Sequence, residues 1–68
     1  MNFIDLVMDN GELVRVEIPD EHFDDVMDDI ENTMKRRDWW PSSYDGVKAT
    51  YLGNILNCVN MGRVVGRM

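Results

Sequence analysis

Acidic side chains are the most concentrated chemical feature of this sequence. Seven carboxylates fall within residues 20–31, where apolar residues recur at helical spacing between them. Such a pattern places the acids in a row along the outside of a helix. The row is either a plain solvated face or a negative strip that docks on a basic surface, such as the nucleic-acid groove of another protein. As a partner-binding surface it would comprise Asp24, Asp25, Asp28, Asp29 and Glu31.

Arginine and aromatic residues form a second group directly after the acidic stretch. A guanidinium group beside an aromatic ring can pair with a phosphate while the ring stacks on a base, and the same residue types form hot spots in protein interfaces. We expect one of the two tryptophans to be buried against the core and the other to be exposed. Arg63 and Arg67 either join this basic patch or balance the acidic helix of a neighbouring subunit. As a ligand-binding site the group would comprise Arg36, Arg37, Trp39, Trp40, Tyr44, Arg63 and Arg67.

His22 and Cys58 are the remaining reactive side chains. His22 follows Glu21 at the predicted start of the helix, which indicates a surface histidine. Cys58 lies in an apolar segment without a basic neighbour, which predicts a buried, unreactive thiol. A structural zinc site needs more Cys and His ligands than these two, a regular helix lacks the glycine turn of a calcium loop, and the phosphate-loop and hydrolase motifs are missing. We therefore expect no catalytic residue, no metal and no cofactor, and a protein that is not an enzyme.

Two apolar runs in residues 3–18 predict a β-hairpin, because they flank Asp9-Asn10-Gly11, a strong turn signal. A two-residue turn would mix charged and apolar residues on both faces. A loop of odd length centred on Gly11 instead collects the apolar residues on one face, although it places Asp5 opposite Glu17, with Arg15 diagonal to Asp5. We prefer this second register.

A helix is predicted to begin at Pro19-Asp20, with Asp20 as its N-cap. Acids crowd its first turns and three cations its last turn, which suits the helix dipole. Its apolar stripe should lie on the apolar face of the hairpin. The stripe comprises Phe23, Val26, Met27, Ile30 and Met34.

The second half of the chain is predicted to form a loop and then short strands. Pro41 disfavours helical geometry at Trp40, so residues 38–46 are expected to be a loop. A strand over 47–52 and a turn at Gly53-Asn54 follow. Residues 55–68 fit a helix in part, but their glycines favour strands. The expected fold is α+β, a single domain over 1–68 with the order ββαββ and the helix across one face of an antiparallel sheet.

The size and charge of the chain limit its partners. A chain of 68 residues buries only a small core, so we expect a second copy, forming a homodimer, or another protein to add stability. The net charge of −6 disfavours direct binding to nucleic acid, although residues 46–68 carry three cations and no acid. A free thiol, the lack of a signal-peptide pattern and the lack of a long apolar run predict a cytoplasmic protein that does not contact membranes.

In its size, its acidity and its acidic segment 20–31, the chain resembles small phage-encoded inhibitors of host defence, of the anti-CRISPR or DNA-mimic type. The resemblance implies a stoichiometric inhibitor in the host cytoplasm, whose carboxylates occupy the Lys/Arg channel of a nuclease or defence complex. The basic C-terminal third departs from a molecule that imitates DNA over its whole surface.

Two other functional classes stay open. One is a homo-oligomer that sequesters a signalling nucleotide with the arginine and tryptophan residues at the subunit interface. The other is a structural or regulatory subunit whose exposed strand edges complete a sheet in another chain.

Overall fold

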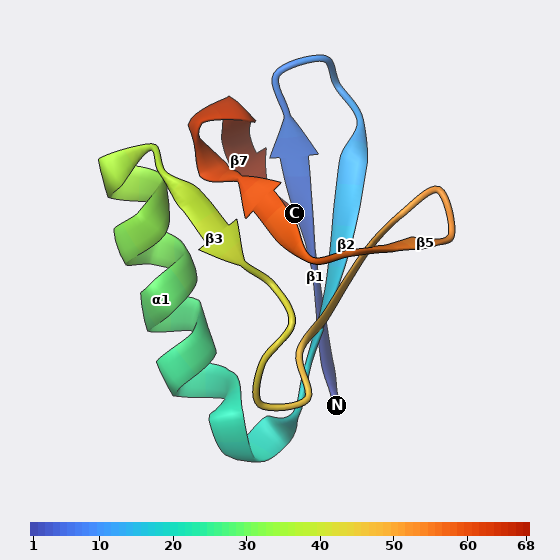
Figure 1. Cartoon of the computed structure of the whole chain (residues 1–68), viewed down its shortest axis with the longest axis vertical. Coiled ribbons are helices and arrows are strands. Elements are labelled where there is room, and N and C mark those ends of the chain that lie inside the picture. The colour runs from blue at the N-terminus through green and yellow to red at the C-terminus, as the bar shows by residue number, and fades with distance from the viewer.

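The computed structural model describes residues 1–68 and contains one α-helix, seven β-strands and two 3₁₀ turns (Figure 1). The elements in chain order are β1 (Asn2–Met8), β2 (Leu13–Ile18), η1 (Asp20–His22), α1 (Phe23–Arg36), β3 (Trp39–Pro41), β4 (Lys48–Tyr51), β5 (Asn54–Leu56), β6 (Cys58–Asn60), η2 (Met61–Arg63) and β7 (Val64–Arg67).

The predicted α+β class is confirmed, whereas the predicted order ββαββ is wrong. Five antiparallel strands form one sheet in the order β5-β4-β2-β1-β7, and β3 pairs with β6 in a separate two-stranded ribbon. The extra strands are only three or four residues long. Runs of this length carry too few alternations to be recognised as strands in a sequence.

The apolar face of the β1–β2 hairpin is the predicted one, but its register differs by two residues. Leu6 pairs with Val14, and both side chains are buried. Asp5 lies opposite Arg15 instead of Glu17, and the two side chains form an ion pair of 3.1 Å. The like-charge contact that the predicted register would have produced is therefore absent.

The position of the hairpin loop explains this register. The loop consists of three residues, Asp9, Asn10 and Gly11, because the Met8 N–H donates to the Glu12 carbonyl oxygen at 2.8 Å. Gly11 has φ 84°, the left-handed conformation that the last position of a three-residue hairpin loop requires. Gly11 thus closes the loop instead of lying at its centre.

Helix α1 packs its apolar stripe into the core, as predicted. Val26 and Ile30 are fully buried, and Phe23 and Met34 pack against the margin of the same core. The helix ends at Arg37, which adopts a left-handed φ of 54° and donates its N–H to the Met34 carbonyl oxygen. Such a cap satisfies carbonyl groups that the helix itself leaves without partners.

The start of the helix differs from the prediction. Residues 20–22 form η1, α1 begins at Phe23, and no side chain caps either element. The Asp20 carboxylate instead binds the N-terminal ammonium group at 2.9 Å and the Asn2 side chain at 2.8 Å. Asp20 therefore fastens the N-terminus of β1 to the helix entry.

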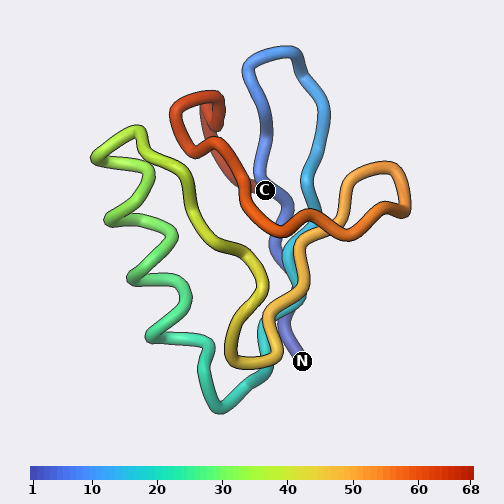
Figure 2. The backbone as a smooth tube through the Cα atoms, in the orientation of Figure 1, coloured from blue at the N-terminus to red at the C-terminus, as the bar shows by residue number.

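One extended stretch of chain passes directly from the five-stranded sheet into the ribbon. Only Asn57 separates β5 from β6, so residues 54–60 run from the five-stranded sheet into the ribbon with β3 (Figure 2). This ribbon adds Trp40 and Val59 to the core, where both are almost fully buried. The residues predicted as a loop, 38–46, therefore include a core-forming strand.

The C-terminal region forms strands rather than a helix, as preferred from the sequence. Its last strand, β7, pairs with β1 at the edge of the five-stranded sheet. The β4–β5 turn lies one residue earlier than predicted, at Leu52 and Gly53, with φ values of 50° and 81°. Positive φ at both positions is typical of a two-residue type I′ turn. Leu52 is 82% exposed at the tip of this hairpin.

Candidate functional site

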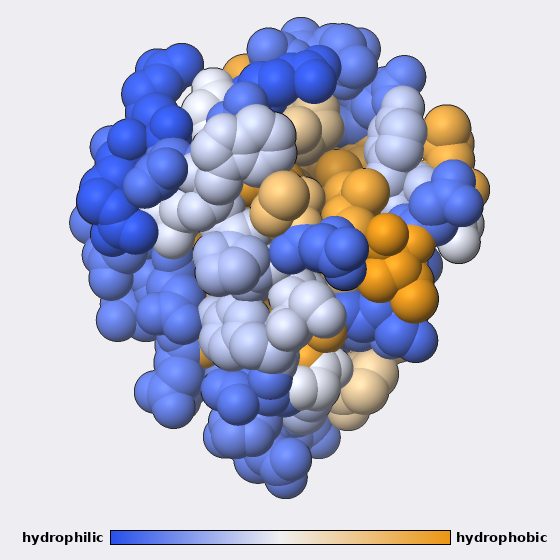
Figure 3. All heavy atoms as spheres, viewed as in Figure 1, coloured by the Kyte–Doolittle hydropathy of each residue, from blue (hydrophilic) through white to orange (hydrophobic).

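The outer surface of α1 gathers the five predicted carboxylates, and we call this surface the acidic face. All five side chains are exposed, on the side of the helix opposite the buried Val26 and Ile30. Figure 3 shows hydrophilic residues covering the molecule along α1, at the left of the view. The members of the acidic face are Asp24, Asp25, Asp28, Asp29 and Glu31.

Three members of the acidic face have no side-chain partner within the chain. The ion pairs and hydrogen bonds of the structure leave the carboxylates of Asp24, Asp25 and Asp28 unpaired. Glu31 Oε1 lies 3.7 Å from a terminal nitrogen of Arg67. Arg67, on β7, is the one cation of the chain that pairs with the acidic face.

Another member of the acidic face, Asp29, is held in place by an aromatic pair, the buried Trp40 and the partly buried Tyr44. The Tyr44 hydroxyl donates to Asp29 Oδ2 at 2.8 Å and accepts a hydrogen bond of 3.3 Å from Trp40 Nε1. The two rings meet edge to face, with centroids 6.2 Å apart. The side chain of Asp29 is therefore oriented through Tyr44 by the hydrophobic core.

This environment keeps Tyr44 in its neutral form. Burial, together with the hydrogen bond and negative charge of Asp29, raises the pKa of Tyr44 to about 12, although the hydrogen bond from Trp40 acts in the opposite direction. A neutral hydroxyl is the form that donates to a carboxylate. The contact with Asp29 therefore persists throughout the physiological pH range.

The predicted arginine and tryptophan site is not assembled in one place. Trp40 is 1% exposed and Trp39 is 59% exposed, which confirms that one tryptophan is buried and one available. Arg67 lies at the acidic face, whereas Arg63 pairs with Asp9 beside the hairpin loop at 3.2 Å. Arg63 and Arg67 are therefore each engaged with a carboxylate of the same chain, on different parts of the surface.

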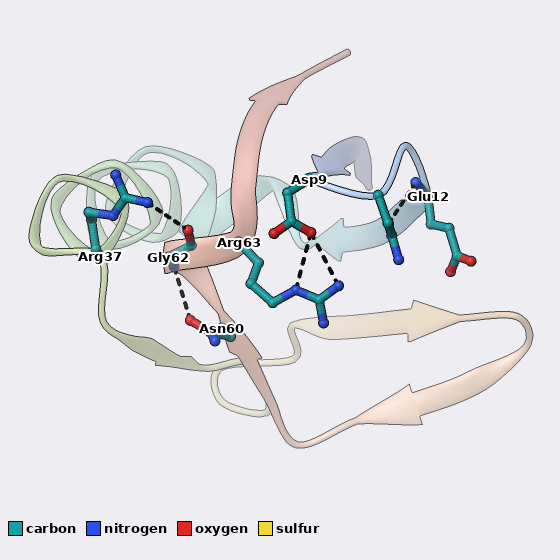
Figure 4. A network of polar contacts seen from close by, with 7 residues as sticks. Asp9, Glu12, Arg37, Asn60, Gly62 and Arg63 are labelled. Carbon is teal, nitrogen blue, oxygen red and sulfur yellow. Dashed lines mark hydrogen bonds and ion pairs between the residues drawn. The ribbon is translucent and has the colours of Figure 1, made fainter.

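The two arginines at the end of the helix make contacts of their own. Arg36 donates to the Thr33 hydroxyl at 3.4 Å, and Arg37 donates to the Gly62 carbonyl oxygen at 3.2 Å. Figure 4 shows Arg37 and Arg63 on opposite sides of the η2 turn, with Gly62 between them. Arg36 and Arg37 thus each make a hydrogen bond within the chain.

Cys58 is exposed, so its predicted burial is wrong. Side chains of β6 alternate between the two faces of the strand, and Val59 takes the buried position, so its neighbour Cys58 faces outward. His22 is partly exposed, and its Nε2 lies 3.9 Å from a Glu21 carboxylate oxygen. Neither side chain lies in a cluster of three potential metal ligands, and the structure contains no such cluster.

A small pocket lies between the β1–β2 loop, the β4–β5 hairpin and η2, and we call it the inter-hairpin pocket. Its volume is about 200 Å³, and charged Glu12 and Arg63 line it together with apolar side chains such as Met8 and Leu56. No local sequence pattern indicates this pocket, because its lining residues extend from Met8 to Arg63 along the chain. Of these residues, only Arg63 belongs to a site predicted from the sequence, the arginine and tryptophan group.

Comparison of the chain with protein-family models, curated proteins and solved structures finds no match. None of its helices has the length and apolar composition needed to span a membrane.

Proposed function

We propose that this chain is a non-enzymatic binding protein whose acidic face docks on a Lys/Arg-lined, nucleic-acid-binding surface of a partner protein and blocks that surface. The observation that carries the proposal is the row of exposed carboxylates without cationic partners at Asp24, Asp25 and Asp28. In line with the resemblance to phage inhibitors of host defence, the expected partner is a nuclease or a defence complex of the host.

The charge density of the acidic face is close to that of nucleic acid. Residues 24–31 span about 10 Å along the helix axis, at about 1.5 Å per residue, so their five carboxylates lie on average about 2.6 Å apart along that axis. Duplex DNA carries one negative charge per about 1.7 Å of its axis. A channel of lysines and arginines that accepts a phosphate backbone would therefore meet a negative electrostatic field of comparable strength along α1.

The acidic face is also organised before any partner arrives. The helix is fixed by the buried side chains of Val26 and Ile30, and Asp29 is oriented by Tyr44. Little conformational entropy remains to be lost on binding, which favours affinity. Like charges at the i,i+4 pairs Asp24/Asp28 and Asp25/Asp29 repel by about 0.2–0.5 kcal/mol each, and a cationic partner relieves this repulsion.

The nucleotide-sequestering alternative has less support. A base stacks on an accessible ring face, and Trp40 is 1% exposed. Arg63 and Arg67 are each paired with a carboxylate of the same chain, at 3.2 Å and 3.7 Å. A nucleotide would have to compete with these carboxylates for the two arginines, and Trp39 is the one tryptophan exposed for stacking.

Affinity capture with three forms of the purified chain tests the proposal. The wild type, Asp24→Asn/Asp28→Asn and the control Glu12→Gln/Asp45→Asn are each immobilised and exposed to a bacterial lysate, and retained proteins are identified by mass spectrometry. Both double variants lose two negative charges, but the control leaves α1 unchanged. We expect a nucleic-acid-binding protein to be retained by the wild type and the control, and lost by Asp24→Asn/Asp28→Asn. Equal retention by all three forms would refute the role of the acidic face.

A further inference from the structure

The inter-hairpin pocket combines an apolar floor with a charged rim. Met8 and Val14 of the first hairpin are buried at its base, and Tyr51 and Leu56 of the β4–β5 hairpin are partly buried along its side. At about 200 Å³ the pocket is smaller than the range of about 300–1,000 Å³ typical of sites for drug-sized ligands. It has room only for a small ligand.

The rim carries both signs of charge. Arg63 contacts Asp9 through Nε and one terminal nitrogen, both 3.2 Å from the same oxygen, Oδ1. The other terminal nitrogen of the guanidinium group has no partner within the chain, and the Glu12 carboxylate also has none. Figure 4 shows both side chains on the side of the first hairpin loop that faces the β4–β5 hairpin.

The backbone under the rim is fixed. The Asn10 side-chain oxygen accepts a hydrogen bond of 3.0 Å from the Glu12 N–H, and the Asp9 N–H donates to the Arg63 carbonyl oxygen at 2.7 Å. The loop that carries Glu12 and the turn that carries Arg63 are therefore tied together. The backbone positions from which the anionic and cationic side chains of the rim extend are therefore fixed relative to one another.

We propose that the inter-hairpin pocket binds a free hydrophobic α-amino acid of about the size of leucine. The apolar side chain contacts Met8, Val14 and Leu56, the carboxylate accepts hydrogen bonds from Arg63, and the ammonium group donates to Glu12. A purely apolar ligand would cover two charged groups without pairing them, which is costly, and an ion of one sign would pair only one of them. A zwitterion with an apolar side chain matches the floor and both charges of the rim.

This inference goes beyond the proposed function and does not depend on it. The pocket is built from the two hairpins and η2, whereas the acidic face lies on α1. A double variant such as Asp24→Asn/Asp28→Asn should bind the amino acid as the wild type does. Loss of partner binding and loss of amino-acid binding are thus separate observations.

Titration of the ¹⁵N-labelled chain with L-leucine, followed by NMR, tests the proposal. We expect shifts confined to the backbone amides around the pocket, such as those of Glu12, Leu56 and Arg63. N-acetyl-L-leucine lacks the ammonium group and L-leucinamide lacks the carboxylate, and each should bind about tenfold more weakly, since each loses one charged hydrogen-bonding group. Lack of any localised shift with L-leucine, or equal binding of the three compounds, would overturn the proposal.

Variants of the rim provide the matched comparison. Arg63→Gln and Glu12→Gln should each raise the dissociation constant for L-leucine about tenfold. Asp9→Asn is the control, because it removes the ion pair with Arg63 but keeps the guanidinium group, and it should bind L-leucine at least as tightly as the wild type. Unchanged binding in Arg63→Gln would refute the assignment, and so would equal weakening in Arg63→Gln and Asp9→Asn, because it would show that only the ion pair and the loop shape that it sets are needed.

Discussion

At the scale of single residues, Tyr44 connects the core to the acidic face through one hydroxyl group. Its replacement by phenylalanine removes the donor to Asp29 and leaves the buried Trp40 Nε1–H without its acceptor. We expect Tyr44→Phe to lower the free energy of unfolding by about 1–2 kcal/mol, measured by urea denaturation. Trp39→Phe is the control, because the exposed Trp39 side chain makes no hydrogen bond, and it should cost less. Equal stability of wild type and Tyr44→Phe would contradict the hydrogen-bond chain.

The raised pKa of Tyr44 predicts how this contribution depends on pH. The ordinary tyrosine pKa of 10.0 applies to the unfolded chain, and the value in the folded protein is about 12. The neutral hydroxyl is thus favoured by folding, so its stabilising effect is complete below about pH 10 and is lost as the pH rises through about 12. The difference in unfolding free energy between wild type and Tyr44→Phe should therefore shrink above pH 10. A difference that stays constant up to pH 12 would contradict this assignment.

Some residue-level features could be predicted from the sequence and others could not. The expectation that one of Trp39 and Trp40 is buried against the core is met, although the segment was expected to be a loop; in the strand β3 neighbouring residues face opposite sides. The pairing of Asp5 with Arg15 was missed, since it depends on whether Gly11 ends the loop or lies at its centre. The contact between Arg67 and Glu31 joins positions far apart in the chain and has no local signal.

At the scale of elements, Gly46 fixes the approach of the 42–47 loop to the end of β2. Its φ is +79°, and a Cβ atom there would lie 2.9 Å from Cγ of Pro19. Gly11 has a similar φ of +84° but open space around it. We therefore expect Gly46→Ala to lower the free energy of unfolding more than Gly11→Ala, which should cost only the backbone strain of about 1–2 kcal/mol. Urea denaturation of both variants measures this order, and the reverse order would contradict the contact with Pro19.

Helix α1 should show opposite effects on stability and binding. Asp28 lies four residues after Asp24 and three before Glu31, so it is repelled from both sides. We expect Asp28→Lys to raise the free energy of unfolding by about 0.5–1 kcal/mol, because two repulsions become attractions, and to lose partner binding. Thermal unfolding and the capture experiment measure the two effects. If Asp28→Lys is less stable than the wild type, or if it still binds the partner, this account of Asp28 is contradicted.

The helix was predictable because its period of apolar residues extends over several turns, whereas the later strands were not. β3 is three residues long, includes Pro41 and lies in a segment with the composition of a loop. Its partner β6 follows β5 after a single residue, so the chain changes sheets within residues 54–60. Which strand pairs with which is decided by long-range packing of Trp40 and Val59, and this information is absent from local patterns.

At the scale of the whole molecule, the acidic face and several exposed apolar residues lie on different elements. The acidic face covers α1, while exposed apolar residues lie on the five-stranded sheet and its hairpins, with Phe3, Leu13 and Ile55 at 57%, 44% and 60% exposure. The homodimer expected from the small size of the chain stays a prediction. If it forms through this apolar surface, both acidic faces remain free for partners.

The central claim is that the acidic face occupies a surface that would otherwise hold nucleic acid. The most direct measurement is a competition experiment: the captured partner is loaded with a fluorescent oligonucleotide, and the chain is added while fluorescence anisotropy is recorded. We predict that the wild-type chain displaces the oligonucleotide, that higher salt weakens this effect, and that Asp24→Asn/Asp28→Asn does not displace it. A stable ternary complex, in which the partner holds the chain and the oligonucleotide together, would contradict the account.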